Sequence, residues 1–190
     1  MNIFERFSLS REIIMREGEI ILDQQKMQIL PVNFIAAYQL RLKDSPGKLL
    51  ELYESMKNGM IKYSKPLGKE YSFSYRNFLD RWVKYTTFGG WGIAEYKLIE
   101  ETSNYGFLHI KNSPLHLNLK AKGITEPFDV FLKGIIAGAL SGTFKADIDV
   151  IETKCVCAGN DVCIYYWGTK EYLQKKFPEI VSKQLTRDQK

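Results

Sequence analysis

The sequence predicts an α+β fold in which an antiparallel sheet packs against helices. Apolar residues recur at spacings of three and four through much of the first half of the chain, which is typical of amphipathic helices. After the Gly89-Gly90 pair the period changes to two, which is typical of strands. The expected order is therefore helices, hairpin, helix, hairpin and helix, a layout characteristic of α+β folds.

Residues 18–30 contain two apolar runs around a polar interruption, which predicts a short hairpin or an extended lead-in segment. The pattern becomes helical after Pro31, and we expect a first helix that begins near Asn33. The Ser-Pro-Gly run at 45–47 ends this helix, because proline and glycine are poor helix formers.

Ser45 and Pro46 also suit the start of a second helix, since serine is a good N-cap and proline is favoured in the first turn. We expect this helix to stop near Pro66 to Gly68. A third helix should follow Ser72 or Ser74 and end at the glycine pair at 89–90. The first half of the chain is thus predicted to be mostly helical.

The second half is predicted to contain two hairpins and two helices. Alternating residues predict one hairpin with strands near 93–99 and 107–110, joined by a turn at 102–104, and another with strands near 146–156 and 162–167. A helix is expected over 127–143, with Pro127 at its start, and a last helix over 169–183.

Glycines at positions 134, 138 and 142 of the expected 127–143 helix leave one helix face without bulk. Such a face allows close approach of another segment, a bound ligand or a second copy of the chain. Plain packing within the molecule is an equally good interpretation.

Composition sets limits on the class of protein. The length of 190 residues suits one domain, and 45% hydrophobic with 26% charged residues is ordinary for a globular protein. The net charge is +5, but basic and acidic residues alternate even in the basic stretch from Lys170 to Lys190, so nucleic-acid binding is not expected. No signal-peptide layout and no membrane-length apolar run is visible, so we expect a cytoplasmic protein.

The segment 150–167 carries metal-capable groups at Glu152, Cys155, Cys157 and Cys163. Three clustered cysteines do not suit a disulfide scaffold, whereas thiolates with a carboxylate suit zinc. Regular strand alternation would put Glu152 and Cys155 on opposite faces, so a shared ion requires a bulge or an early end to the strand. The alternative is that the cysteines are small buried apolar residues beside a turn.

The spacing of Glu152, Cys155, Gly159 and Cys163, after the small-residue segment GIIAGALSG at 134–142, resembles the 4-vinyl reductase domain family. This family occurs in archaeal predicted hydrocarbon-binding proteins and in sensor domains of phenol- and xylene-responsive activators. The resemblance covers most of residues 18–168. It implies a homodimer and a fold related to small TRAPP-type subunits, with one domain over 1–190 in which residues 169–190 form a C-terminal helix and tail.

In aromatic-sensing members of the family, a further cysteine at the start of the glycine helix completes a four-ligand zinc site. The matching position here is Asp129, so the chain departs from the family pattern. The resemblance therefore implies a structural zinc on Glu152, Cys155 and Cys163, with Asp129, Cys157 or water as the fourth ligand. An aspartate oxygen is harder than a thiolate and is a poorer match in such a site.

Aromatic side chains gather where the third expected helix meets the first expected hairpin. The resemblance implies that these residues wall a pocket for a hydrophobic or aromatic small molecule: Trp82, Tyr85, Trp91, Tyr96, Phe107 and His109. The alternative is that the aromatic residues form ordinary core and that His109 is a satisfied histidine. His116, close after Pro114, has no evident partner.

These observations predict a small-molecule-binding sensory domain stabilised by structural zinc, rather than an enzyme. One alternative is a reductase acting on a vinyl-type substituent, the activity that gave the family its name, although no flavin or nicotinamide motif is visible. Another alternative is a regulator that binds nucleic acid or a protein partner through its basic tail.

Overall fold

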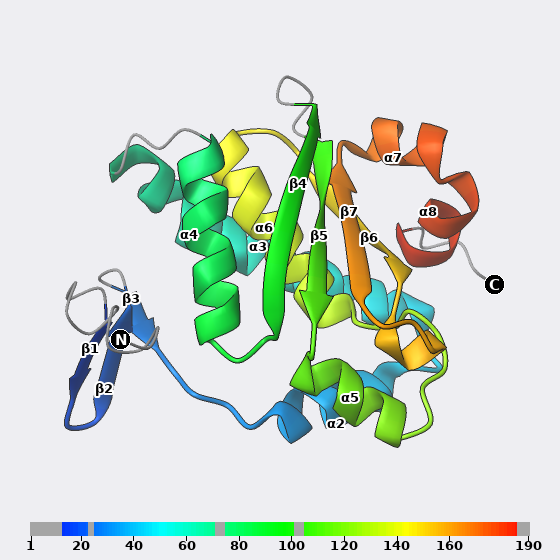
Figure 1. The fold of residues 1–190 in the computed structure, drawn as a ribbon, viewed down its shortest axis with the longest axis horizontal. Helices are drawn as coiled ribbons and strands as arrows, with labels where there is room; N and C mark the ends of the chain where they lie inside the picture. The colour runs from blue at the N-terminus through cyan, green and yellow to red at the C-terminus, as the bar shows by residue number, and fades with distance from the viewer. Residues whose placement is uncertain (1–12, 23–24, 71–74, 101–104, 186–190) are drawn as a thin grey trace.

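A four-stranded antiparallel sheet forms the centre of the molecule (Figure 1). The computed structural model describes residues 13–22, 25–70, 75–100 and 105–185. The two predicted hairpins supply the strands, which are β4 (Ile93–Glu100) with β5 (Tyr105–Lys111) and β6 (Asp149–Lys154) with β7 (Cys163–Gly168). Their order is β4-β5-β7-β6, so β5 and β7 join the hairpins and β6 lies at an edge.

Helices cover the sheet and complete the predicted α+β fold, which is confirmed. The described helices are α2 (Val32–Leu42), α3 (Pro46–Glu70), α4 (Tyr75–Phe88), α5 (Pro114–Ala121), α6 (Val130–Phe144), α7 (Lys170–Lys176) and α8 (Pro178–Leu185). In Figure 1, α6 and α3 lie behind the sheet, α4 lies alongside β4, and α7 with α8 lie beside β6 and β7.

Strand alternation divides the sheet into a core face and a second face. Leu108 and Ile110 of β5 are paired with Tyr165 and Cys163 of β7, and all four are fully buried. The intervening residues, such as Phe107, are only half-buried and lie on the opposite face. The core therefore lies between the sheet and the helices behind it.

The glycines of α6 pack directly against α3. A Cβ atom at Gly138 would lie 2.3 Å from the carbonyl oxygen of Lys57, and one at Gly142 would lie 2.1 Å from Ser64 Oγ. Only glycine allows the two helix backbones to approach this closely. Of the three possibilities for the glycine face, the structure shows packing within the molecule.

Four expected boundaries are wrong. The helix α3 continues through Pro66 to Glu70, because its packing along α6 outweighs the local cost of proline. The helix α6 begins at Val130 rather than at Pro127, where the Asp129 side chain accepts a hydrogen bond from the Leu132 N–H and caps the helix.

The expected last helix is two helices. Phe177 has φ −138° and ends α7, because the ring of Pro178 disfavours a helical conformation at the residue before it. The helix α5 was not expected at all, although Ser113 and Pro114 repeat the start signal seen at Ser45 and Pro46. The 102–104 turn lies outside the described residues.

The expected hairpin at 18–30 is a three-stranded meander of β1 (Ile13–Arg16), β2 (Glu19–Leu22) and β3 (Gln25–Met27). Figure 1 shows this small sheet standing apart from the main body, at the end of an extended connection to α2. Among the described residues, no helix is long and apolar enough to cross a membrane.

Candidate metal site

The end of β6 brings Glu152 and Cys155 to the same place. The pairing of β6 with β7 shifts register between Glu152 and Lys154, and the strand ends at Lys154. Cys155 then accepts a hydrogen bond from the Cys157 N–H at the start of a 3₁₀ turn, Val156–Ala158. Gly159, with φ 85°, turns the chain back toward β7. The sequence required such an irregularity for a shared ion, and the structure has it.

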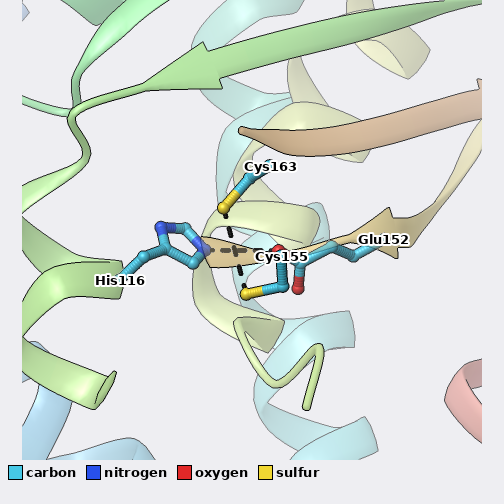
Figure 2. Close-up of side chains that lie close together, drawn as sticks. All are labelled: His116, Glu152, Cys155 and Cys163. Atoms are coloured by element: carbon cyan, nitrogen blue, oxygen red, sulfur yellow. Dashed lines mark hydrogen bonds and ion pairs between the residues drawn. The ribbon is translucent and has the colours of Figure 1, made fainter. Parts of the chain in front are cut away.

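Four buried side chains converge at this position (Figure 2). Each of His116, Glu152, Cys155 and Cys163 offers one ligand atom, and these atoms all lie within 4.8 Å of one another. The Sγ atoms of Cys155 and Cys163 are 3.9 Å apart, and His116 Nε2 lies 3.4 Å from Glu152 Oε1. The three ligands expected from the sequence are therefore together, joined by a histidine that was not expected.

His116 reaches the cluster from α5, and its ring orientation is fixed on both sides. The Nδ1 atom lies 2.8 Å from Ser113 Oγ, while Nε2 lies 2.7 Å from the hydroxyl oxygen of Tyr165. When Nδ1 carries the proton and donates to Ser113, the lone pair of Nε2 points toward the cluster. The short helix thus presents its imidazole as a candidate ligand.

Asp129 and Cys157, the two residues expected as alternative fourth ligands, lie at the border of the cluster. Asp129 is fully buried, with Oδ1 used to cap α6 and Oδ2 placed 3.5 Å from His116 Nε2. The Cys157 Sγ atom lies 3.3 Å from the His116 carbonyl oxygen, to which it donates. Neither belongs to the group of four ligand atoms, whereas His116 does.

The buried ionisable groups perturb one another strongly. Burial by itself would lower the pKa of His116, but Glu152 and Asp129 outweigh burial and raise this pKa to about 9. Burial raises the pKa of Glu152 to about 7 against the opposing effect of His116. Hydrogen bonds from Cys157 and Cys163 lower the pKa of the Cys155 thiol. Acidic groups crowded together away from water create a strong demand for positive charge.

The cluster fits a metal ion by two structural criteria. Zinc with Zn–S bonds of about 2.3 Å separates two tetrahedral sulfur ligands by about 3.8 Å, close to the observed 3.9 Å and far longer than a disulfide. Both Glu152 carboxylate oxygens are buried without a hydrogen-bond partner in the part of the chain that the structure describes. Such oxygens are costly to bury unless a cation satisfies them. The cluster could therefore hold a metal.

The six residues expected to wall a pocket do not share one face of the sheet. Four lie on or beside α4: Trp82 and Tyr85 are on the helix, the Trp91 N–H donates to the Thr86 carbonyl, and Tyr96 donates to Asp80. Phe107 and His109 stack on each other on the opposite face, 4.8 Å apart between ring centroids. A single wall made by all six is wrong, because residues 107 and 109 alternate with the core residue Leu108.

His116 is the residue that the sequence interpretation missed. Its helix was not predicted, so nothing placed it near a motif that lies far downstream. The one available signal was the Ser113-Pro114 pair, which marks a helix start and would have put His116 in the first turn. Even so, contact between α5 and the 156–158 turn is a tertiary feature.

Comparison with known proteins agrees with the fold and with the motif. Over 150 residues the chain is 28% identical to an uncharacterized protein of Methanocaldococcus jannaschii, covering 79% of this chain and 85% of the relative. The phenol-responsive sensory domain of the transcription activator PoxR, solved with phenol, superposes with a TM-score of 0.75 at 18% identity, covering 94% of this chain and 95% of that one.

A trafficking protein particle complex subunit 3 from Naegleria fowleri, covalently bound to palmitic acid, gives a TM-score of 0.49 at 13% identity, covering 72% of this chain and 93% of that one. The family model of the 4-vinyl reductase domain matches residues 108–165, the part that contains His116, Glu152, Cys155 and Cys163. The chain therefore carries a 4-vinyl reductase domain, and the resemblance to this family found in its sequence is confirmed.

Proposed function

We propose that this protein is a small-molecule-binding sensory domain whose last hairpin is held by a structural zinc ion. The observation that carries the proposal is the buried convergence of His116, Glu152, Cys155 and Cys163, with both Glu152 oxygens lacking a hydrogen-bond partner among the described residues. Zinc would join β6, β7 and α5, three segments that no disulfide connects.

Zinc is the metal that suits this donor set best. Two thiolates disfavour magnesium and calcium, which prefer oxygen ligands, while imidazole and carboxylate complete a common set for zinc. Four protein ligands in a fully buried place leave no open position for a substrate, which is characteristic of structural rather than catalytic zinc. We therefore assign the fourth ligand to His116, with Asp129 as a neighbouring acceptor.

The sensory part of the proposal rests on the fold. PoxR uses its domain of this fold for a response to phenol, and the present chain matches that domain over nearly its whole length. We propose a hydrophobic or aromatic ligand, bound on the core side of the sheet near α4, where Trp82, Tyr85, Trp91 and Tyr96 lie. Phe107 and His109, on the opposite face, are left out of this site.

Calorimetric titration with phenol, an alkylphenol and a fatty acid tests ligand binding. We expect saturable binding of at least one compound, with the negative heat-capacity change that accompanies burial of apolar surface. Trp91→Ala should weaken this binding, because Trp91 stacks on Phe131 on the core side, whereas Phe107→Ala should not. Absence of saturable binding with all three compounds, or equal loss in both variants, would contradict the proposed site.

We also propose that the chain forms a homodimer through an exposed apolar surface, the α2 patch, which consists of Ile29, Leu30, Phe34 and Tyr38. Phe34 and Tyr38 are one turn apart on α2 and are 64% and 55% exposed. The nearby three-stranded meander is too small to bury a core of its own, so it also needs a partner surface. A second copy of the chain would cover both.

A further inference from the structure

Gln184 of the last helix makes three hydrogen bonds beside the candidate metal site. Its Oε1 atom accepts from the backbone N–H of Glu152, at 3.0 Å, and from Nζ of Lys133, at 2.9 Å. Its Nε2 atom donates to the Glu152 carbonyl oxygen, at 2.8 Å. One side-chain amide thus occupies both backbone groups of a residue whose carboxylate lies in the cluster.

The position of β6 explains why these bonds matter. The strand lies at the edge of the sheet, so backbone groups that face away from β7 have no neighbouring strand to pair with. Gln184 takes the place of that strand at Glu152, immediately before the register shift. The amide therefore holds the backbone where the strand stops and where the approach to Cys155 begins.

Lys133 adds a charge to the same arrangement. Its side chain comes from α6, is 2% exposed, and interacts electrostatically with Glu152, Asp129 and Cys155. A buried ammonium group needs an acceptor, and Gln184 Oε1 supplies one. The cation offsets part of the negative charge that two thiolates and two carboxylates would place around a divalent ion.

We propose that Gln184 is a positioning residue that couples the docking of α8 to metal binding. Docked α8 holds Glu152 in the orientation that the ion needs, and the ion in turn stabilises docked α8, because linkage between two sites is reciprocal. The apolar contacts of Val181 and Leu185, both buried, hold α8 independently of the metal. This inference rests on the proposed zinc site and gives that site a means of regulating the C-terminal helix.

The test compares Gln184→Met with Gln174→Met in the full chain. Methionine keeps the length and helix propensity of glutamine but removes the amide, and Gln174 is exposed on α7. Zinc affinity is measured by competition with a chromophoric chelator. We expect at least a tenfold loss in Gln184→Met, the usual size for a group that orients a ligand, and no change in Gln174→Met.

Hydrogen exchange with and without zinc supplies a second measurement. In the wild type, zinc should slow amide exchange in α8 more than in α7, and Gln184→Met should lose this difference. Should Gln184→Met fail to fold, the wild-type exchange decides by itself. Zinc binding without any selective effect on α8, or with unchanged affinity in Gln184→Met, would overturn the coupling alone. A wild type that binds no zinc would overturn both the coupling and the zinc site.

Discussion

Glu152 shows how a single carboxylate constrains the chemistry of its surroundings. Its oxygens are buried and lack hydrogen-bond partners among the described residues, and burial raises its pKa to about 7. A buried acceptor without a partner costs on the order of 1–3 kcal/mol, so a cation bound between Glu152, Cys155 and Cys163 would remove a real penalty.

At this scale the sequence predicted three of the four ligand candidates, because Glu152, Cys155 and Cys163 lie on one hairpin and carry a recognisable spacing. Alternation along a regular strand argued against Glu152 and Cys155 acting together, and the register shift after Glu152 removes that objection. His116 could not be predicted in the same way, since its contact with the hairpin depends on how α5 packs.

The identity of the fourth ligand gives a prediction at the residue scale. His116→Ala should weaken zinc binding by at least about tenfold, because it removes an Nε2 donor that lies within reach of the other three ligand atoms. Cys157→Ser should bind zinc as the wild type does, since its Sγ atom donates to the His116 carbonyl rather than facing the cluster. Chelator competition measures both. Loss of binding in Cys157→Ser, with His116→Ala unaffected, would exchange the two roles.

The pairing of α6 with α3 is the clearest feature at the scale of secondary structure. Gly134, Gly138 and Gly142 each face the α3 backbone or a side chain so closely that a methyl group would overlap it. Helix glycines cost about 1 kcal/mol each relative to alanine, and this close packing compensates for that cost.

Gly138→Ala should therefore destabilise the protein by more than about 2 kcal/mol, because its Cβ would lie 2.3 Å from the Lys57 carbonyl oxygen. Gly59→Ala on α3 is the matched control: nothing lies within 4 Å of its Cβ, and it should raise stability by up to about 1 kcal/mol. Urea denaturation measures both free energies of unfolding. Equal small effects in the two variants would show that α6 and α3 are not in close contact.

The element order was predictable because periodicity and turn residues report local structure directly. The glycine pair at 89–90 ended α4 and began the hairpin as expected. The failures have non-local or subtle causes: α3 passes through Pro66 because α6 supports it, and the final helix divides at Pro178. The pairing of β5 with β7, which brings the two hairpins into one sheet, carries no sequence signal of its own.

At the scale of the whole molecule, the α2 patch and the small N-terminal sheet both leave apolar surface without cover. Isolated exposed apolar residues are common, but Ile29 and Leu30 directly precede the helix that carries Phe34 and Tyr38. This concentration along one segment is the basis for the proposed homodimer.

Light scattering coupled to size-exclusion chromatography tests the dimer. The double variant Phe34→Lys/Tyr38→Lys should shift the protein from dimer to monomer, because it would place two charges in an apolar interface. Ile93→Lys changes another apolar residue, 48% exposed on β4, and should leave the dimer intact. A monomeric wild type, or dissociation caused equally by Ile93→Lys, would contradict the proposed interface.

Native mass spectrometry combined with elemental analysis tests the zinc site most directly. Wild-type protein should carry one zinc per chain, and Cys163→Ser should carry none while retaining the wild-type far-ultraviolet circular dichroism spectrum. The same measurement reports the oligomer and the mass of any retained ligand. A folded wild type that is purified without metal and fails to take up added zinc would contradict the account at its centre.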